Sequence, residues 1–248
     1  MGALSITAAA LAVLGANESA GRTHVMPAGQ AGHVAVLVLE NRSYGQVIGN
    51  PDAPYLNRLA RGSALATRYY AISHPSLPNY IALTGGSEFR ITSDCALCDT
   101  SATNLVGQLD GAGISWKAYF EGLTSAVRPG AITPIYNPHY NPFVYYDSVR
   151  HDAEASARVV GFGQLRRDLR TRSLPRFSWI APGVLHDGHN SSLRQADAYA
   201  SQLVPKILRA LGPRGVLYLT WDEGAASDHS GLAGTSGGGH VALIAAGG

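Results

Sequence analysis

The chain has 248 residues, of which 46% are hydrophobic and 15% are charged, and its formal net charge is +2. That length is enough for one compact domain with a sizeable core, or for two small ones. Two cysteines exclude a disulfide-rich scaffold, and a balance of 19 basic to 17 acidic residues argues against a dedicated nucleic-acid-binding protein. No apolar run reaches the roughly 18 residues that a membrane span requires, so we expect no stable insertion into a membrane.

The N-terminal segment differs from the rest of the chain. Ile6–Leu14 is an apolar stretch of signal-peptide length, but no Lys or Arg occurs before Arg22 and the cleavage site is poor. A secretory signal and a ragged helical N-terminus both stay open. We therefore treat residues 1–30 as a signal-like or disordered segment and residues 31–248 as the folded domain. The expected location is secreted or associated with the cell envelope, with the cytoplasm as the alternative.

Apolar runs typical of strands alternate with helical patterns along the remaining chain. Val34–Leu39 is apolar on both faces, as a central strand covered on both sides must be. The alternation predicts an α/β fold with a mostly parallel sheet between helical layers. In chain order the further expected elements are a helix at Ala53–Arg61, a strand at Ala66–Ile72, helices at Leu77–Leu83 and Leu105–Ala112, and strands at Ile114–Tyr119, Phe177–Ala181 and Val216–Thr220.

The strongest helical pattern covers Leu193–Leu211, where apolar residues recur at helical spacing. Asn190 or Ser191 is expected to cap this helix, and Gly212 is expected to end it. The charged run Arg166–Arg172 is expected to form the solvated face of another helix.

Two other segments carry predictions about packing. The stretch Pro129–Asp147, rich in Tyr, Pro and Asn, is expected to be a long loop. Val241–Ala246 is apolar on both faces, yet only two glycines follow it. We therefore expect a chain that is incomplete at its C-terminus, with this strand near the sheet edge and its apolar side chains exposed. His240, just before it, reaches the functional edge only if the strand runs antiparallel or the loop doubles back.

Polar residues cluster where the predicted strands end. Glu40–Asn41 follows the first strand, His74–Ser76 the second, His186–His189 comes after Phe177–Ala181, and Asp222–Glu223 ends the series. Each cluster alone has a plain explanation as a turn, a helix cap or a solvated pair. In open α/β sheets, however, ligands bind outside the carboxyl ends of the strands. Four clusters at that edge predict a functional site.

Ser76 precedes a predicted helix, whose N-terminus would direct free N–H groups towards a group on the serine hydroxyl. That geometry suits a phosphorylated serine, and a plain N-cap serine fits position 76 equally well. A hydrolase motif of the form G-x-S-x-G also occurs at Gly234–Gly238. No convincing strand precedes it and no apolar helix follows it, so we interpret it as a glycine loop.

The clustered side chains are of types that bind metal ions. Glu40, Asn41, Asp222, Glu223 and the Ser76 hydroxyl would form an all-oxygen site, and Asp187, His189 and His240 would form a mixed nitrogen and oxygen site. Two divalent ions about 4 Å apart are a common arrangement for phosphoryl transfer. The sequence lacks a zinc signature and a Walker glycine loop, so one or two divalent ions of unspecified identity are expected.

Four segments together resemble a known family: residues 39–44 (LENRSY), 73–80 (SHPSLPNY), 187–189 (DGH) and 220–224 (TWDEG). They are similar to the phosphoesterase family of bacterial acid phosphatases and phospholipases C, within the alkaline phosphatase superfamily. The resemblance runs from about His33 to the end of the chain. It implies an alkaline-phosphatase-like fold.

The resemblance also implies roles for individual residues. Ser76 matches the nucleophile, and Asn79 matches an amide that holds a phosphate oxygen. Asp187 and His189 match metal or acid/base positions, His189 or His186 is a candidate to protonate the leaving alkoxide, and His240 resembles a last histidine ligand. The matching metal ligands are Glu40, Asn41, Asp222 and Glu223. The family often has His-Asn-Pro-Phe where this chain has Tyr140-Asn141-Pro142-Phe143, so the role of His139, one place early, stays open.

Cys95 and Cys98 form a C-x-x-C pair that suits a redox motif, a metal ligand pair or a small disulfide. Export of the protein would favour a local structural disulfide, and both cysteines lie outside the predicted site.

The predicted function is metal-dependent hydrolysis of phosphate esters, by an acid-phosphatase-like phosphomonoesterase working through a phosphoserine. Its partner would be a small phosphate ester or a phospholipid head group, without nucleic acid. The alternatives are a phosphodiesterase or phospholipase C, and a non-catalytic domain that binds a metal or an anion.

Overall fold

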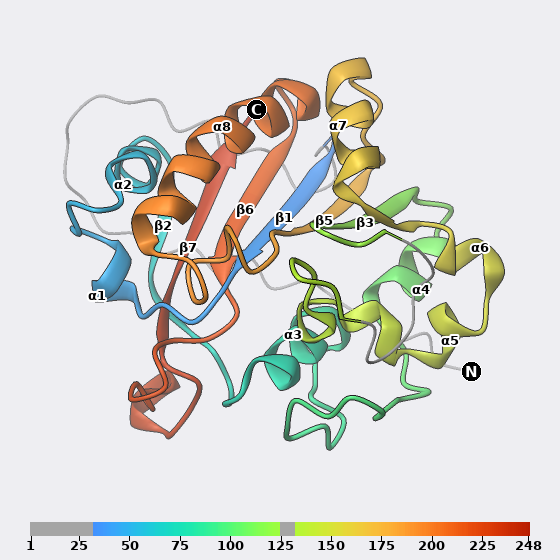
Figure 1. The fold of residues 1–248 in the computed structure, drawn as a ribbon, viewed down its shortest axis with the longest axis horizontal. Coiled ribbons are helices and arrows are strands. Elements are labelled where there is room, and N and C mark those ends of the chain that lie inside the picture. Colours follow the sequence, from blue (N-terminus) through green and yellow to red (C-terminus); the bar gives the residue numbers. More distant parts are fainter. Residues whose placement is uncertain (1–31, 125–131) are drawn as a thin grey trace, which may run out of the picture.

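The computed structural model describes residues 32–124 and 132–248, and within these residues the chain forms one seven-stranded sheet (Figure 1). The strand order is β2-β7-β6-β1-β5-β3-β4. β1 pairs in parallel with β5 and β6, β3 pairs in parallel with β4 and β5, and only β7 runs antiparallel to its neighbours β2 and β6. The strands are β1 (Val34–Leu39), β2 (Ala64–Tyr70), β3 (Trp116–Phe120), β4 (Val159–Gly161), β5 (Phe177–Ala181), β6 (Val216–Trp221) and β7 (His240–Gly247). The predicted α/β class with a mostly parallel sheet is confirmed.

Helices cover both faces of this sheet. On one face α2, α7 and α8 pack over the strands, and on the other α3 and α4 lie beside two short 3₁₀ turns, η1 and η2 (Figure 1). The helical elements are α1 (Tyr44–Val47), α2 (Pro54–Arg61), α3 (Ser76–Gly85), α4 (Leu105–Gly111), η1 (Pro138–Tyr140), η2 (Pro142–Tyr145), α5 (Asp147–Arg150), α6 (Ala153–Ser156), α7 (Phe162–Thr171), α8 (Leu193–Leu211) and η3 (Leu232–Gly234).

The apolar run of β1 follows from its place at the centre of the sheet. Ala35, Leu37 and Leu39 belong to the hydrophobic cluster under α8, whereas Val38 belongs to the cluster on the opposite face. Successive side chains of a strand point to opposite faces, so a strand covered on both sides must be apolar throughout.

The boundaries of α8 match the prediction, but its N-cap does not. Ser192 caps the helix and forms a capping box with Gln195, so the prediction of Asn190 or Ser191 was wrong by one or two positions. The chain enters the helix later because Ser191 donates its hydroxyl to Asp187 instead. Gly212 ends the helix as predicted.

The stretch predicted as a long loop is largely core, in the part that the structure describes from residue 132 onward. The 3₁₀ turns η1 and η2 bury Tyr140, Phe143, Val144 and Tyr145 in the cluster beneath α3. The Pro and Asn residues produce tight turns rather than a solvated loop, and the aromatic residues between them supply the packing surface. Residues 129–131 of the predicted loop lie outside the described residues.

The predicted exposure of the apolar side chains of the last strand was also wrong. β7 lies one strand in from the edge, between β2 and β6, and Val241, Ala242, Ile244 and Ala246 are buried. Its antiparallel direction is one of the two arrangements allowed above, and it brings His240 to the same edge of the sheet as the strand ends.

In the parts of the chain that the structure describes, no helix is both long and apolar enough to cross a bilayer. Cys95 and Cys98 are joined by a disulfide, which decides among the three uses left open for that pair.

Candidate active site

Four acidic and amide side chains meet where β1 and β6 end. These strands are neighbours and pair Leu39 with Trp221, so Glu40 and Asp222 follow them side by side. The backbone N–H of Asn41 donates to Asp222 Oδ1 at 2.9 Å. Asn41 has φ +51°, a left-handed conformation that costs energy in residues other than Gly, and such strain often occurs at functional sites.

The Ser76 hydroxyl lies in the middle of this group, at the first turn of α3. Its Oγ is 3.1 Å from Glu40 Oε2, 3.3 Å from Asn41 Oδ1 and 3.5 Å from Glu223 Oε1. A hydroxyl has one hydrogen to donate, so it satisfies only one of these oxygens at a time. Ser76 therefore stands among acceptors that favour removal of its proton.

The three carboxyl groups are almost completely buried, with exposures of 0% for Glu40, 2% for Asp222 and 3% for Glu223. Burial and the nearby charge of Asp222 raise the pKa of Glu40 well above its ordinary range. Burial and the charge of Glu223 raise the pKa of Asp222 to about 8, and burial with the charge of Asp94 raises that of Glu223 to about 8. Like charges in a desolvated site disfavour one another, so this group calls for a positive partner.

The residues present fit a single divalent cation. Asp222 Oδ2 is buried without a hydrogen-bond partner, and within the described residues no Lys or Arg forms an ion pair with Glu40, Asp222 or Glu223. No three His, Cys, Asp or Glu side chains in the described ranges are arranged to hold an ion by themselves, so Asn41 and Ser76 would complete the ligand set. Carboxylate, amide and hydroxyl oxygens are ligands that hard divalent cations prefer.

Asn79 lies next to this group but holds the chain rather than facing open space. Its Oδ1 accepts from the backbone N–H groups of Ile72 and Ser73, and its Nδ2 donates to the carbonyls of Ser73 and Pro75. Nδ2 is also 3.5 Å from Glu223 Oε2. These bonds fix the loop that delivers Ser76 to the site.

Asp187 is buried, but the surrounding chain satisfies both of its carboxylate oxygens. Oδ1 accepts from the backbone N–H groups of residues 189–191 and from the Ser191 hydroxyl, while Oδ2 accepts from Tyr140 and Asn190. This pattern closes the turn between β5 and α8 and leaves no lone pair directed at an ion.

The three predicted histidines do not join the Ser76 group. His189 is exposed. His186 contacts the Glu121 carboxylate through Nδ1 at 2.9 Å and stacks on Tyr199. His240 stacks between Tyr44 and Tyr70, and its Nε2 lies 3.1 Å from the carbonyl of Thr67. The expected mixed nitrogen and oxygen site is therefore not assembled in the described structure.

Sequence reasoning missed three residues beside the site. His74 Nδ1 is 2.8 Å from Glu223 Oε2, although His74 was noted only as part of a motif. Tyr80 donates its hydroxyl to Glu40 Oε1, and its position four residues after Ser76, on the same helix face, is a signal that could have revealed it. Asp94 accepts from the N–H of Leu77 at 2.9 Å, and no local pattern marks it.

The glycine loop after η3 packs directly against the segment that precedes Ser76. The N–H of Gly238 donates to the carbonyl of Ala71, and a Cβ added at Gly238 would come within 2.1 Å of the Ser73 carbonyl oxygen. Only glycine permits this approach. The G-x-S-x-G match thus lies in a loop that packs against the segment before Ser76.

Comparison with known proteins decides the family. The phosphoesterase family profile matches residues 50–231, which is most of the chain and includes Ser76, Asp222 and Glu223. The chain belongs to the phosphoesterase family. Glu40 and Asn41 lie just before the matched range, so their inclusion in the site rests on the geometry above.

Two relatives illustrate the likeness. A phosphatidylinositol-3-phosphatase of Mycobacterium tuberculosis is 29% identical, over 84% of this chain and 69% of the relative. A phosphate-repressible acid phosphatase of Penicillium chrysogenum is 32% identical, over 68% of this chain and 43% of the relative. This chain therefore spans less than half the length of the fungal relative.

Solved structures share the fold. A protein of the alkaline phosphatase superfamily from Vibrio parahaemolyticus superimposes with a TM-score of 0.61, covering 88% of this chain and 60% of that one, at 14% identity. A phosphonate monoester hydrolase of Agrobacterium radiobacter gives 0.51, covering 86% and 67%, also at 14% identity. The predicted alkaline-phosphatase-like architecture is confirmed.

Proposed function

We propose that residues 31–248 form a phosphate ester hydrolase in which Ser76 is the nucleophile. The observation that carries this proposal is the Ser76 hydroxyl, placed at the start of α3 within 3.5 Å of Glu40, Asn41 and Glu223. A hydroxyl surrounded by buried acceptors loses its proton readily once a cation balances the charge. Family membership and the names of the relatives support phosphate esters as the substrate class.

The reaction proceeds in two displacements. Ser76 Oγ attacks phosphorus as its proton leaves, the ester P–O bond breaks, and the alcohol departs with a proton. Water then attacks the phosphoserine, and phosphate leaves while the proton returns to Ser76 Oγ. A phosphoryl group on Ser76 Oγ would lie at the N-terminal end of α3, where the helix dipole stabilises developing negative charge.

Glu40, Asn41, Asp222 and Glu223, with the Ser76 hydroxyl, would hold a divalent cation. When bound, such a cation lowers the pKa of a coordinated hydroxyl and neutralises charge on a transferring phosphoryl group. Tyr80 orients Glu40 through its donated hydrogen bond, and His74 orients Glu223. Asn79 positions the loop before Ser76, so its effect on phosphate would pass through that loop.

His189 is the proposed proton donor to the leaving alkoxide, since it is exposed at the same edge of the sheet and has no hydrogen bond from its ring within the described residues. His186 is a weaker choice because its Nδ1 contacts the Glu121 carboxylate and its ring stacks on Tyr199.

A phosphomonoesterase is favoured over a phosphodiesterase because the two relatives described above are named phosphatases. Asp187 and His240 face other partners, which favours one cation over two. A phospholipid head group that ends in a phosphomonoester belongs to this substrate class, as does a small soluble ester.

The test is release of p-nitrophenol from p-nitrophenyl phosphate and from bis(p-nitrophenyl) phosphate, before and after treatment with EDTA. We expect the monoester to turn over faster, EDTA to stop the reaction and a divalent cation to restore it. Faster turnover of the diester would favour the phosphodiesterase alternative. Turnover of neither ester by metal-loaded protein, with phosphate still bound in calorimetry, would leave only the binding-domain alternative.

A further inference from the structure

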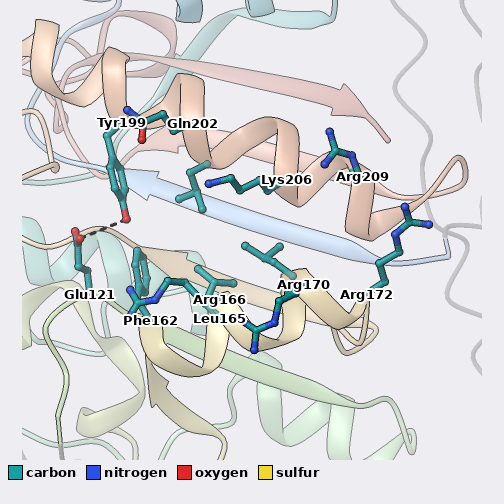
Figure 2. A pocket seen from close by; sticks show the side chains of 12 residues that line it. Glu121, Phe162, Leu165, Arg166, Arg170, Arg172, Tyr199, Gln202, Lys206 and Arg209 are labelled. Atoms are coloured by element: carbon teal, nitrogen blue, oxygen red, sulfur yellow. Dashed lines mark hydrogen bonds between the residues drawn. The ribbon is translucent and has the colours of Figure 1, made fainter.

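A groove separate from the Ser76 group lies between α7 and α8. It has a volume of about 680 Å³, within the range of sites that take small organic ligands. Its outline is set by two helices that diverge over the sheet, with β1 behind them (Figure 2). Nothing in the proposed hydrolysis uses this groove.

The floor of the groove is apolar and recessed. Phe162, Leu165 and Leu169 line it from α7, and Leu203 lines it from α8. Phe162, Leu165 and Leu203 are buried, whereas Leu169 is half-buried. The eight residues from Phe162 to Leu169 give a floor about 10 Å long at the rise of an α-helix.

The rim of the groove is positively charged. Its basic residues are Arg166, Arg170, Arg172, Lys206 and Arg209, and all five are exposed. None of their side chains has a hydrogen-bond or ion-pair partner within the part of the chain that the structure describes. Figure 2 shows Arg172 and Arg209 at one end of the groove and Glu121 and Tyr199 at the other, with Arg166 and Arg170 along α7 between them.

The acids near this face have other partners. Asp168 of α7 accepts from Lys117 and Tyr119 on the sheet. Glu121, the one acidic residue of the lining, contacts His186 and accepts from Tyr199. The lining of the groove holds five basic residues against one acidic residue, so its net charge is positive.

Helix electrostatics explain only part of this charge. Arg170, Arg172 and Arg209 lie at the C-terminal ends of their helices, where cations interact favourably with the helix dipole. Arg166 lies in the middle of α7, one turn before Arg170, and like charges at this spacing are destabilising. Lys206 stands three residues before Arg209 and repels it in the same way. Basic side chains that repel one another beside an apolar floor are the arrangement expected of a site for an anionic, partly apolar ligand.

We propose that this groove binds a single-chain anionic amphiphile. The alkyl chain lies along Leu169, Leu165 and Phe162, and the acidic head group lies among Arg170, Arg172 and Arg209. The recessed floor favours an inserted chain over a flat membrane, which would meet the charged rim before it reached the leucines. The paired cations on two helices favour an anion over a neutral lipid.

Calorimetry with decanesulfonate, below its micelle concentration, tests this proposal on the full chain. Its carbon–sulfur bond is not an ester, so the Ser76 site cannot turn it over. We expect one site per chain and binding at least about tenfold tighter than that of methanesulfonate, because methylene groups leave water on binding. Decyltrimethylammonium, which has the same tail and the opposite charge, should not bind measurably.

Variants locate the site. Arg170→Gln with Arg209→Gln should weaken decanesulfonate binding by about tenfold or more, whereas Arg167→Gln with Arg61→Gln, which removes the same charge outside the groove, should change it less than about twofold. Leu169→Asn should also weaken decanesulfonate binding and leave methanesulfonate binding unchanged. Hydrolysis of p-nitrophenyl phosphate should be unaltered in all of them.

Several outcomes would overturn the proposal. Equal losses in the two double variants would show only general surface attraction, and displacement of decanesulfonate by inorganic phosphate in proportion to occupancy of the Ser76 site would place it there instead. A polyglutamate peptide that binds the groove as tightly as decanesulfonate would make it a site for an acidic protein segment. A large gain in affinity after removal of residues 1–31 would identify that segment as the occupant.

Discussion

The buried carboxylate of Asp168 and the buried carboxylates around Ser76 differ in which groups balance their charge. Asp168 is 4% exposed and accepts from Lys117 Nζ at 2.7 Å, Tyr119 at 2.8 Å and Gln164 at 2.7 Å. Burial raises the pKa of Asp168, but the hydrogen bonds from Lys117, Tyr119 and Gln164 outweigh it and leave that pKa below its ordinary value.

The carboxylates around Ser76 have the opposite character. Burial raises the pKa values of Glu40, Asp222 and Glu223, and a nearby negative charge raises each further: that of Asp222 at Glu40, that of Glu223 at Asp222 and that of Asp94 at Glu223. The fold supplies the partners of Asp168 from its own side chains, whereas the Ser76 group is left short of positive charge. A buried acid completed by the chain stabilises the fold, and a buried acid left incomplete indicates a place for something the chain does not provide.

The largest expected effect is loss of activity in Ser76→Ala. Removal of the nucleophile should lower kcat for p-nitrophenyl phosphate by more than about a hundredfold. The free energy of unfolding should change by only about 1 kcal/mol, since a single hydroxyl that donates to Glu40 is lost. Ser73→Ala is the matched control, because within the described residues the Ser73 hydroxyl hydrogen-bonds only to the neighbouring carbonyl of His74. Retention of more than about a hundredth of wild-type kcat would exclude covalent catalysis at Ser76.

Removal of one carboxylate from the Ser76 group should lower activity but raise the stability of the metal-free protein. Asp222→Asn and Glu40→Gln should each lower affinity for the divalent cation and lower kcat/KM, and their double variant should be little worse than either single change. In EDTA, however, each should raise the melting temperature, because the folded chain then lacks an acid whose pKa burial and like charge raise, and such an acid costs stability at neutral pH. Thermal melts with and without the cation measure both effects. Additive losses of activity would show that the two residues do not share an ion.

Local sequence patterns predicted the strands and the residues around Ser76, but they did not predict the contacts of every side chain at that edge of the sheet. The apolar runs predicted the parallel strands, and the strand-end rule gathered Glu40, Asn41, Ser76, Asp222 and Glu223 at one edge. The same rule brought Asp187 to that edge, and the antiparallel direction of β7, one of the two arrangements allowed, brings His240 there. Neither indicates where the side chain points. Asp187 closes a turn and His240 stacks between tyrosines, because neighbours distant in sequence compete for them.

Asp168 is a residue whose burial the sequence pattern did not predict. It lies in the run Arg166–Arg172, which the charge pattern predicts to be solvated, and the prediction fails for this one residue. Its partners Lys117 and Tyr119 come from β3, about fifty residues earlier, so no local window contains them. The buried aromatic turns η1 and η2 were missed for the same reason, since only the tertiary packing under α3 distinguishes them from a loop.

Asp168→Asn should destabilise the fold without affecting catalysis. The change leaves Lys117 without its counter-ion and turns one acceptor into a donor, so we expect a loss of about 3 kcal/mol in the free energy of unfolding. Asp99→Asn, which breaks an exposed ion pair with Arg150, is the control and should cost less than about 1 kcal/mol. Urea unfolding followed by circular dichroism measures both. A drop in kcat/KM of folded Asp168→Asn matching that of Asp222→Asn would mean that the two groups are not independent.

The smallest expected effect is a pH dependence of stability that belongs to Asp168. Its folded pKa lies below the ordinary value of 3.8, so the unfolded chain binds more protons between those two values and stability rises with pH there. The contribution is fully present above the unfolded pKa and is lost as pH falls through the folded pKa. The gap in unfolding free energy between the wild type and Asp168→Asn should thus be constant above about pH 5 and shrink in stronger acid. Urea titrations at a series of pH values, with Asp99→Asn beside them, measure this gap. A gap that stays constant down to the acid limit of folding would show that the hydrogen bonds to Asp168 do not favour its charged form.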